Sequence, residues 1–100
     1  MSTILTGVSG HFCAAHRDDA GRLHGHTWKV RAWFKCPSPA DAACHKVALG
    51  AVLAQWDHTD LSDRGMMWGE DIARAVGTLV NCVEVEVSRE AEGYYARWLA

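Results

Sequence analysis

The feature that most constrains the fold is an alternation of side-chain character between residues 24 and 36. Alternate residues of this segment are mainly apolar, apart from two histidines, and the residues between them are mainly polar. Because alternate side chains of a β-strand point to opposite faces, the pattern predicts a half-buried strand with two histidines on its apolar side. The apolar face comprises His24, His26, Trp28, Val30, Ala32 and Phe34.

The spacing of His24 and His26 has a chemical consequence. Side chains two residues apart on a strand share a face and lie about 6.6 Å apart along it, so both imidazoles can reach one metal ion. A third imidazole, that of His16, lies a few residues upstream. Three histidines with an open fourth position are typical of catalytic zinc. The residues alone leave a second interpretation open, in which these histidines are polar groups at a strand end without a ligand role.

The whole chain shows the order β-β-α-α-β-β. We predict strands over 4–16, 24–36, 83–87 and 94–99, and helices over 41–56 and about 70–80. Gly7 and Gly10 suggest a bulge in the first strand. The order indicates an α+β fold with an antiparallel four-stranded sheet and both helices on one face. With 100 residues and no linker or repeat, we expect a single domain over 1–100.

Composition argues against several classes of protein. The net charge is −2 and no basic tract is present, so neither nucleic acid nor an anionic membrane is an expected partner. The four cysteines lack C-x-x-C spacing, which argues against a zinc finger, a redox dithiol or a disulfide framework. The sequence has no signal-peptide pattern and no long apolar run, so we expect a cytoplasmic protein.

Short motifs along nearly the whole chain resemble the 6-pyruvoyl-tetrahydropterin synthase family, which includes 6-carboxy-tetrahydropterin synthase. These motifs are F-x-A-A-H over 12–16, L-H-G-H over 23–26, D-H followed by D-L over 57–61, Asp41 at the start of a predicted helix, and the pair Glu70–Asp71. The resemblance implies a tunnelling-fold subunit. In such folds the sheets of several subunits join edge to edge, here as a homotrimer or homohexamer, which would cover the unpaired sheet edges.

The resemblance also implies roles for particular residues. His16, His24 and His26 would hold Zn²⁺, and Asp57 would orient His58 for proton transfer with a small-molecule pterin substrate. A histidine suits this task because its ordinary pKa lies near working pH. His58 could instead simply cap the end of a helix.

The activity that this resemblance favours is that of 6-carboxy-tetrahydropterin synthase. This lyase acts on 7,8-dihydroneopterin triphosphate in the route to queuosine and other 7-deazaguanine compounds. Two alternatives stay open. One is a divergent family member that cleaves the pterin side chain to another product, and the other is a non-catalytic zinc protein that binds a pterin or purine.

The sequence departs from the family at the expected nucleophile. Members that release or rearrange the pterin side chain carry a cysteine four residues before the first histidine of H-G-H, and here that position is Ala20. Three explanations stay open: an engineered replacement at Ala20, a carboxylate from Asp18 or Asp19, or a role for Cys13. Strand alternation places Cys13 on the face opposite His16. We therefore favour a carboxylate, with Asp19 ahead of Asp18.

The substrate contacts depart from the family as well. In the family, a glutamate after the third strand holds the pyrimidine edge of the pterin. Aligned without a gap, Arg89 falls on that position, whereas a one-residue bulge would bring Glu90 there. We predict Glu90 as the pterin anchor and Glu70 as a second substrate-binding residue. Arg89 in that place would present a cation to the donor edge of a pterin.

Overall fold

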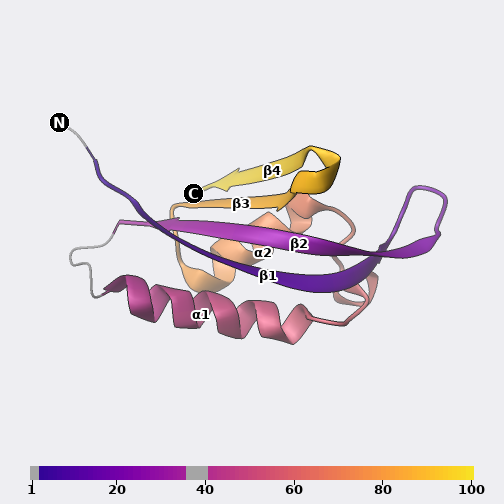
Figure 1. Cartoon of the computed structure of the whole chain (residues 1–100), viewed down its shortest axis with the longest axis horizontal. Helices are drawn as coiled ribbons and strands as arrows, with labels where there is room; N and C mark the ends of the chain where they lie inside the picture. The colour runs from indigo at the N-terminus through magenta and orange to yellow at the C-terminus, as the bar shows by residue number, and fades with distance from the viewer. Residues whose placement is uncertain (1–2, 36–40) are drawn as a thin grey trace.

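The computed structural model describes residues 3–35 and 41–100, and its elements follow the order β-β-α-α-β-β (Figure 1). The second predicted strand extended to Cys36, which lies outside the described residues. Two short 3₁₀ helices, which the sequence pattern did not predict, follow α1 and β3. The elements are β1 (Thr6–Arg17), β2 (Leu23–Phe34), α1 (Asp41–Trp56), η1 (Leu61–Arg64), α2 (Gly69–Val80), β3 (Glu84–Arg89), η2 (Glu90–Glu92) and β4 (Tyr94–Leu99).

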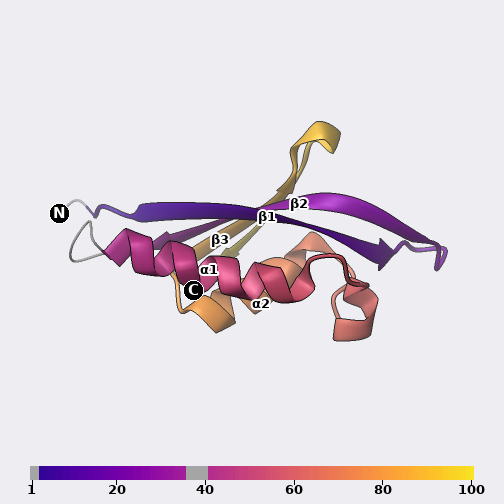
Figure 2. The same cartoon turned by 60° about the horizontal axis from the view of Figure 1, so that its bottom comes forward.

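The four strands form one antiparallel sheet in the order β1-β2-β3-β4. Figure 2 shows both helices on the same side of this sheet. Helix α1 packs on β1, and α2 packs on β3 and β4. The predicted α+β architecture, that of a tunnelling-fold subunit, is confirmed. In the described part of the chain, no helix is long and apolar enough to cross a membrane.

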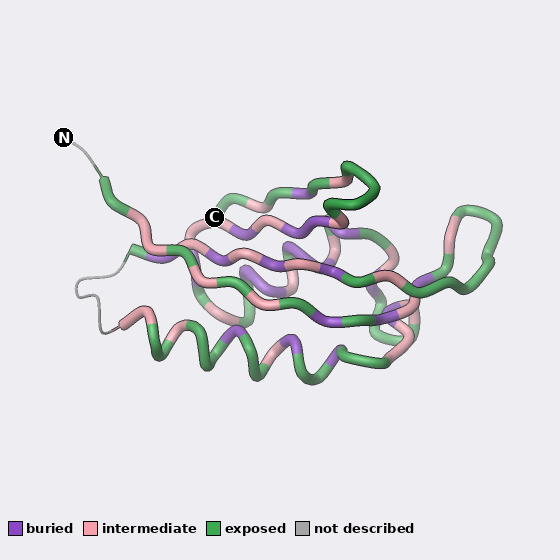
Figure 3. Tube along the Cα trace, viewed as in Figure 1, coloured by how far each residue is buried: buried purple, intermediate pink, exposed green. Residues whose placement is uncertain are grey.

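The alternation in β2 places its apolar face in the core (Figure 3). Trp28, Val30, Ala32 and Phe34 are each at most 3% exposed. They pack with Leu49 and Leu53 of α1 and with Ile72 and Val76 of α2. Burying one large apolar side chain contributes about 1.5–3 kcal/mol. The β2 face that carries the histidines is therefore fixed by the core further along the same strand.

The bulge that Gly7 and Gly10 suggested is absent from the described residues, because β1 pairs with β2 without interruption from Thr6 to Arg17. The glycines instead mark close approaches. A Cβ atom at Gly7 would lie 2.7 Å from the Trp33 ring, and one at Gly10 would lie 2.9 Å from Leu53 Cδ1. A strand glycine often marks such a contact as well as a bulge.

The segment after α1 returns along the outer edge of β1. The His58 amide donates a hydrogen bond to Cys13 O at 2.6 Å, and the Ala15 amide donates one to Thr59 O at 2.9 Å. Asp60 also forms a parallel bridge with Ala15. This segment pairs part of an otherwise open sheet edge, and it brings residues 57–60 beside the strand that carries His16.

The contact between α2 and β4 gives a test of the fold. A methyl group at Gly77 would overlap the Trp98 ring, whereas nothing lies within 4 Å of the corresponding position at Gly50 in α1. Gly77→Ala should lower the free energy of unfolding by about 1–3 kcal/mol, despite alanine's better helix propensity. Gly50→Ala, the matched control, should raise it by about 0.5–1 kcal/mol. Urea denaturation of both variants measures the difference, and equal stabilisation would contradict this packing.

Candidate metal centre and active site

Three histidines meet where β1 and β2 run side by side. His16 pairs directly with His24 across the two strands, and His26 follows two residues along β2. Their ring centroids are 4.8–4.9 Å apart in every pair. One ligand nitrogen from each ring lies within 4.8 Å of the other two, so the three histidines could hold a metal ion.

His16 is the deepest member of this triad, with only 1% of the residue exposed. Its Nδ1 lies 2.6 Å from Met67 O, an acceptor, so the ring proton resides on Nδ1 and Nε2 carries a lone pair. Nε2 is buried and has no hydrogen-bond partner among the described residues. An unsatisfied buried polar group costs about 1–3 kcal/mol. Coordination of a metal ion would satisfy this nitrogen, so the residues fit a metal centre.

The other two histidines also direct Nδ1 toward an oxygen. His26 Nδ1 lies 3.1 Å from Glu92 Oε1, and His24 Nδ1 lies 4.0 Å from Asp18 Oδ2. Histidines that bind metals usually donate their second ring N–H to a carboxylate or carbonyl, as His26 does, whereas the 4.0 Å separation at His24 is too long for a hydrogen bond. Burial, followed by the nearby Arg89 guanidinium, lowers the pKa of His26 below its ordinary value. This favours the neutral ring that a metal ligand requires.

Asp57 and His58 form a hydrogen-bonded pair just after α1. Asp57 Oδ1 accepts from the Cys13 amide and Oδ2 accepts from His58 Nδ1, both at 2.9 Å. The Cys13 amide holds the pKa of Asp57 below its ordinary value, so the carboxylate stays charged. With Nδ1 engaged, His58 leaves Nε2 for proton exchange. The His58 side chain is 81% exposed and lines a shallow pocket together with His26.

The hairpin between β1 and β2 holds the carboxylates considered as bases. Asp18 closes this turn, because its Oδ1 accepts from the amides of Ala20 and Arg22 at 2.9 Å. The Arg22 amide is also the main cause of the lowered pKa of Asp18. Asp19 and Ala20 are exposed in the same turn. Asp18 thus serves the turn, whereas the role of Asp19 stays a prediction.

Cys13 lies on the face of β1 opposite to His16, as the alternation predicts. It is exposed, and its Sγ lies 3.5 Å from Thr27 Oγ1 on the neighbouring strand. The thiol therefore does not join the three histidines.

The two predicted substrate-binding glutamates lie on different elements. Glu70, in the first turn of α2, accepts a hydrogen bond from the Tyr94 hydroxyl at 2.8 Å. Burial and this glutamate raise the pKa of Tyr94 to about 12. Glu90 begins η2 and pairs with Lys29 at 3.4 Å and Arg31 at 3.5 Å.

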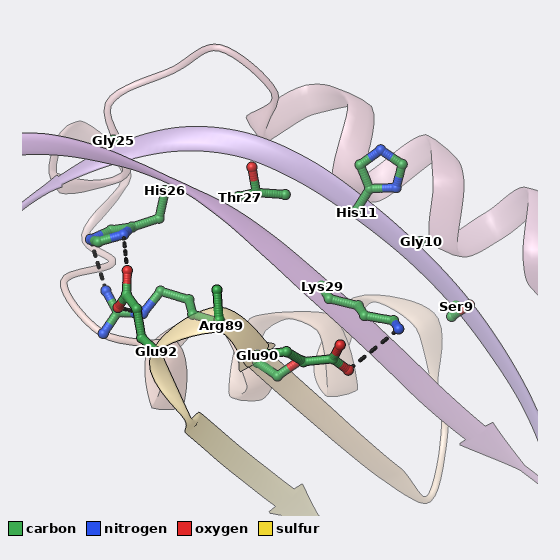
Figure 4. A pocket seen from close by; sticks show the side chains of 12 residues that line it. Ser9, Gly10, His11, Gly25, His26, Thr27, Lys29, Arg89, Glu90 and Glu92 are labelled. Carbon is green, nitrogen blue, oxygen red and sulfur yellow. Dashed lines mark hydrogen bonds and ion pairs between the residues drawn. The ribbon is translucent and has the colours of Figure 1, made fainter.

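The third strand contains no bulge among its described residues, since β3 pairs with β4 continuously from Glu84 to Arg89. Arg89 therefore ends the strand on the same face as the buried Val85 and Val87. Its Nη1 lies 2.8 Å from His26 Nε2 (Figure 4). Glu90 faces the other way, onto the side of the sheet that carries Lys29.

Two residues in contact with His26 were missed from the sequence. Arg89 was considered only as a cation that would not suit the pterin-anchor position. Extending the alternation of β3 by two residues would have placed it on the apolar face. No sequence feature indicated that Glu92 contacts His26. The contact arises because η2 turns Glu92 back toward His26, and nothing in the sequence pattern predicts that short helix.

These residues surround a pocket of about 710 Å³, which is a common size for a small-molecule site. His26, Lys29, Arg89, Glu90 and Glu92 all line it (Figure 4). The pocket therefore brings one member of the candidate metal centre, His26, together with two carboxylates and two cations.

Comparison with known proteins agrees with this geometry. A family model described as 6-pyruvoyl tetrahydropterin synthase matches residues 7–97, a range that includes the three histidines and the Asp57–His58 pair. A comparison with curated proteins gave no match. The family supports a lyase-type activity on pterins. Because the family model spans most of the sequence, the chain belongs to the 6-pyruvoyl tetrahydropterin synthase family.

Proposed function

We propose that the protein is a zinc-dependent lyase of the 6-carboxy-tetrahydropterin synthase type. Its substrate would be 7,8-dihydroneopterin triphosphate, in the route to queuosine and related 7-deazaguanine compounds. The observation that carries the proposal is the buried Nε2 of His16, which lacks a partner among the described residues and points to a ligand shared with His24 and His26. Bound zinc would supply Lewis acidity that lowers the pKa of a substrate hydroxyl.

The Asp57–His58 pair would move the proton. Asp57 keeps the proton of the neutral ring on Nδ1, so Nε2 can accept a proton from the substrate side chain and later return it. His58 has a positive φ of 59°, and its amide donates a hydrogen bond to Cys13 O, so the backbone holds this exposed side chain at the shallow pocket that it lines with His26.

Asp19 would act as the second base, in place of the cysteine that family members carry at the position of Ala20. Asp18 is committed to the turn by its hydrogen bonds to Ala20 and Arg22. The neighbouring Asp19 is exposed in the same hairpin, which leads directly into His24. These observations support Asp19, and not Asp18, as the proposed base.

Glu90 and Glu70 would contact the pterin. Glu90 lines the pocket and would have to exchange its ion pairs with Lys29 and Arg31 for hydrogen bonds to the pyrimidine edge. Arg89 favours the alternative of a divergent activity, because a guanidinium beside His26 does not suit the donor edge of a pterin. In that case, the same metal centre and proton-transfer pair would serve a different ligand.

The metal centre gives the first test of this function. Purified protein should bind about one zinc ion per chain, and His26→Ala should lose stoichiometric binding because it removes one of three protein ligands. His11→Ala is the matched control, since His11 lies outside the triad. Elemental analysis after dialysis measures both variants. Equal zinc retention by His26→Ala and the unchanged protein would rule out this centre.

The proposed reaction is tested by turnover of 7,8-dihydroneopterin triphosphate with chromatographic analysis of the product. His58→Asn and Asp19→Asn should each lower turnover roughly 10²–10⁴-fold, the usual size of a general acid–base contribution. Asparagine at position 58 also tolerates the positive φ found there. His45→Asn is the control, because His45 stacks on Phe34, away from the triad.

Ala20→Cys separates the remaining explanations under the same zinc loading. If Asp19 supplies the base, the unchanged chain is active and the new cysteine is not needed. Restoration of turnover by Ala20→Cys in an otherwise inactive chain would instead identify Ala20 as a replaced nucleophile. Inactivity of all variants would leave a metal-containing binding protein.

We also propose that the protein assembles as a homotrimer or homohexamer. Edge strand β4 and the first half of β1 lie at the margins of the sheet, and Tyr95 and Leu99 of β4 are 58% and 65% exposed. Open sheet edges pair readily with other chains. Light scattering at micromolar concentration should give a mass three or six times that of one chain, and a stable monomer would contradict the proposal.

A further inference from the structure

Arg89 lies at the candidate metal centre with its guanidinium held between two aromatic rings. The guanidinium carbon is 5.0 Å from the Trp28 ring centroid and 4.6 Å from that of Tyr94. Only 16% of its side chain is exposed. Cation–π contacts of this kind stabilise a partly desolvated guanidinium. Tyr94 is itself fixed by its hydrogen bond to Glu70, so Arg89 has little freedom to leave.

The hydrogen bond between Arg89 and His26 uses the nitrogen that a metal would need. Glu92 Oε1 accepts from His26 Nδ1, so His26 Nε2 carries the lone pair. Arg89 Nη1 donates to that lone pair at 2.8 Å (Figure 4). A zinc ion would occupy the same lone pair at about 2.0–2.1 Å. The guanidinium in this position and a metal on His26 therefore exclude each other.

When a metal displaces this hydrogen bond, the two positive charges remain close together. Repulsion between charges a few ångströms apart is strong in a partly buried site, where water screens them poorly. Glu92 offsets part of it, because its carboxylate lies 3.2 Å from Arg89 Nε and 3.1 Å from His26 Nδ1. An anion at the metal's open position would offset the rest.

The guanidinium also has capacity for a ligand. Arg89 lines the pocket, and its Nε is buried and lies 3.2 Å from Glu92 Oε2, so a ligand would bind through the Nη donors. Arginine presents a planar set of donors that matches carboxylate and phosphate oxygens in a bidentate way. A pterin's pyrimidine edge presents donors instead, and these would face the donors of Arg89.

We propose that Arg89 makes this centre a site for a ligand that binds through an oxyanion, either a carboxylate or a phosphate group, held between the metal and the guanidinium. Without such an anion, Arg89 competes with the metal for His26 and lowers the metal affinity without abolishing binding. This inference rests on the proposed metal centre, and it adds the chemical class of the group that the centre selects.

The test measures zinc affinity by competition with a chromogenic chelator, in buffer without coordinating anions. Arg89→Met removes the charge and keeps an apolar chain between Trp28 and Tyr94. It should tighten anion-free zinc binding about tenfold, a common size for effects of groups surrounding metal ligands. Arg97→Met is the matched control, because Arg97 pairs with Glu84 and Glu86 on β3 and does not touch the histidines. It should leave zinc affinity unchanged.

Adding an anion then tests the oxyanion directly. Methylphosphonate and glycolate represent the two sources, phosphate and carboxylate. At least one of them should tighten zinc binding to the unchanged protein about tenfold and have no such effect on Arg89→Met. Arg89→Lys, which keeps the charge without the planar donors, should keep weak anion-free binding and lose most of the anion response.

The visible spectrum of the Co²⁺-loaded protein provides a second readout. The anion should shift the absorption bands at lower concentration in the unchanged protein than in Arg89→Met. Equal zinc affinity and equal anion response in these two proteins would overturn the role of Arg89 and leave the metal centre intact. Failure of every variant to bind zinc would remove the centre, and with it both proposals.

Discussion

The site depends first on the register between β1 and β2. Because His16 pairs with His24 directly across the strands, and His26 follows on the same face, three imidazoles converge without any contribution from a flexible loop. A shift of one residue would turn the histidines of β2 to the opposite face. Such a shift would also expose Trp28, Val30, Ala32 and Phe34, which are buried in the core. The packing of the core therefore fixes the geometry of the candidate metal centre.

Oxygens beside the triad decide which ring nitrogens of His16 and His26 face its centre. Met67 O lies 2.6 Å from Nδ1 of His16 and Glu92 lies 3.1 Å from Nδ1 of His26, whereas Asp18 lies 4.0 Å from Nδ1 of His24, too far for a hydrogen bond. Met67 and Glu92 come from separate parts of the chain, so these two tautomers are set by tertiary structure, whereas the positions of the rings are set by the two strands. The same division holds for Asp57, whose carboxylate is held by a β1 amide and in turn orients His58.

The sequence predicts those parts of the fold that follow from regular periodicity. Helix α1 and strand β4 begin and end at the predicted residues, and the alternation in β2 correctly places the histidines on the core side. The bulge predicted from Gly7 and Gly10 was wrong. The sequence shows that a glycine lacks a side chain, but it does not show that the Trp33 ring lies in the space beside Gly7. The contact between Glu92 and His26 could not be predicted either, because it depends on the short helix η2, which the sequence pattern does not predict.

Arg89 shows why a family match does not by itself determine the ligand. Aligned without a gap, Arg89 falls where the resemblance to the family places a glutamate that accepts hydrogen bonds from a pterin, and a carboxylate there would add negative charge beside a bound metal. Arginine reverses that sign within hydrogen-bonding distance of His26. With a metal bound at the triad, the reversal would change two equilibria together, because a cation that repels the metal would also attract an anionic ligand. Metal binding and ligand binding would then be linked through one side chain, and linkage requires that each strengthen the other by the same factor.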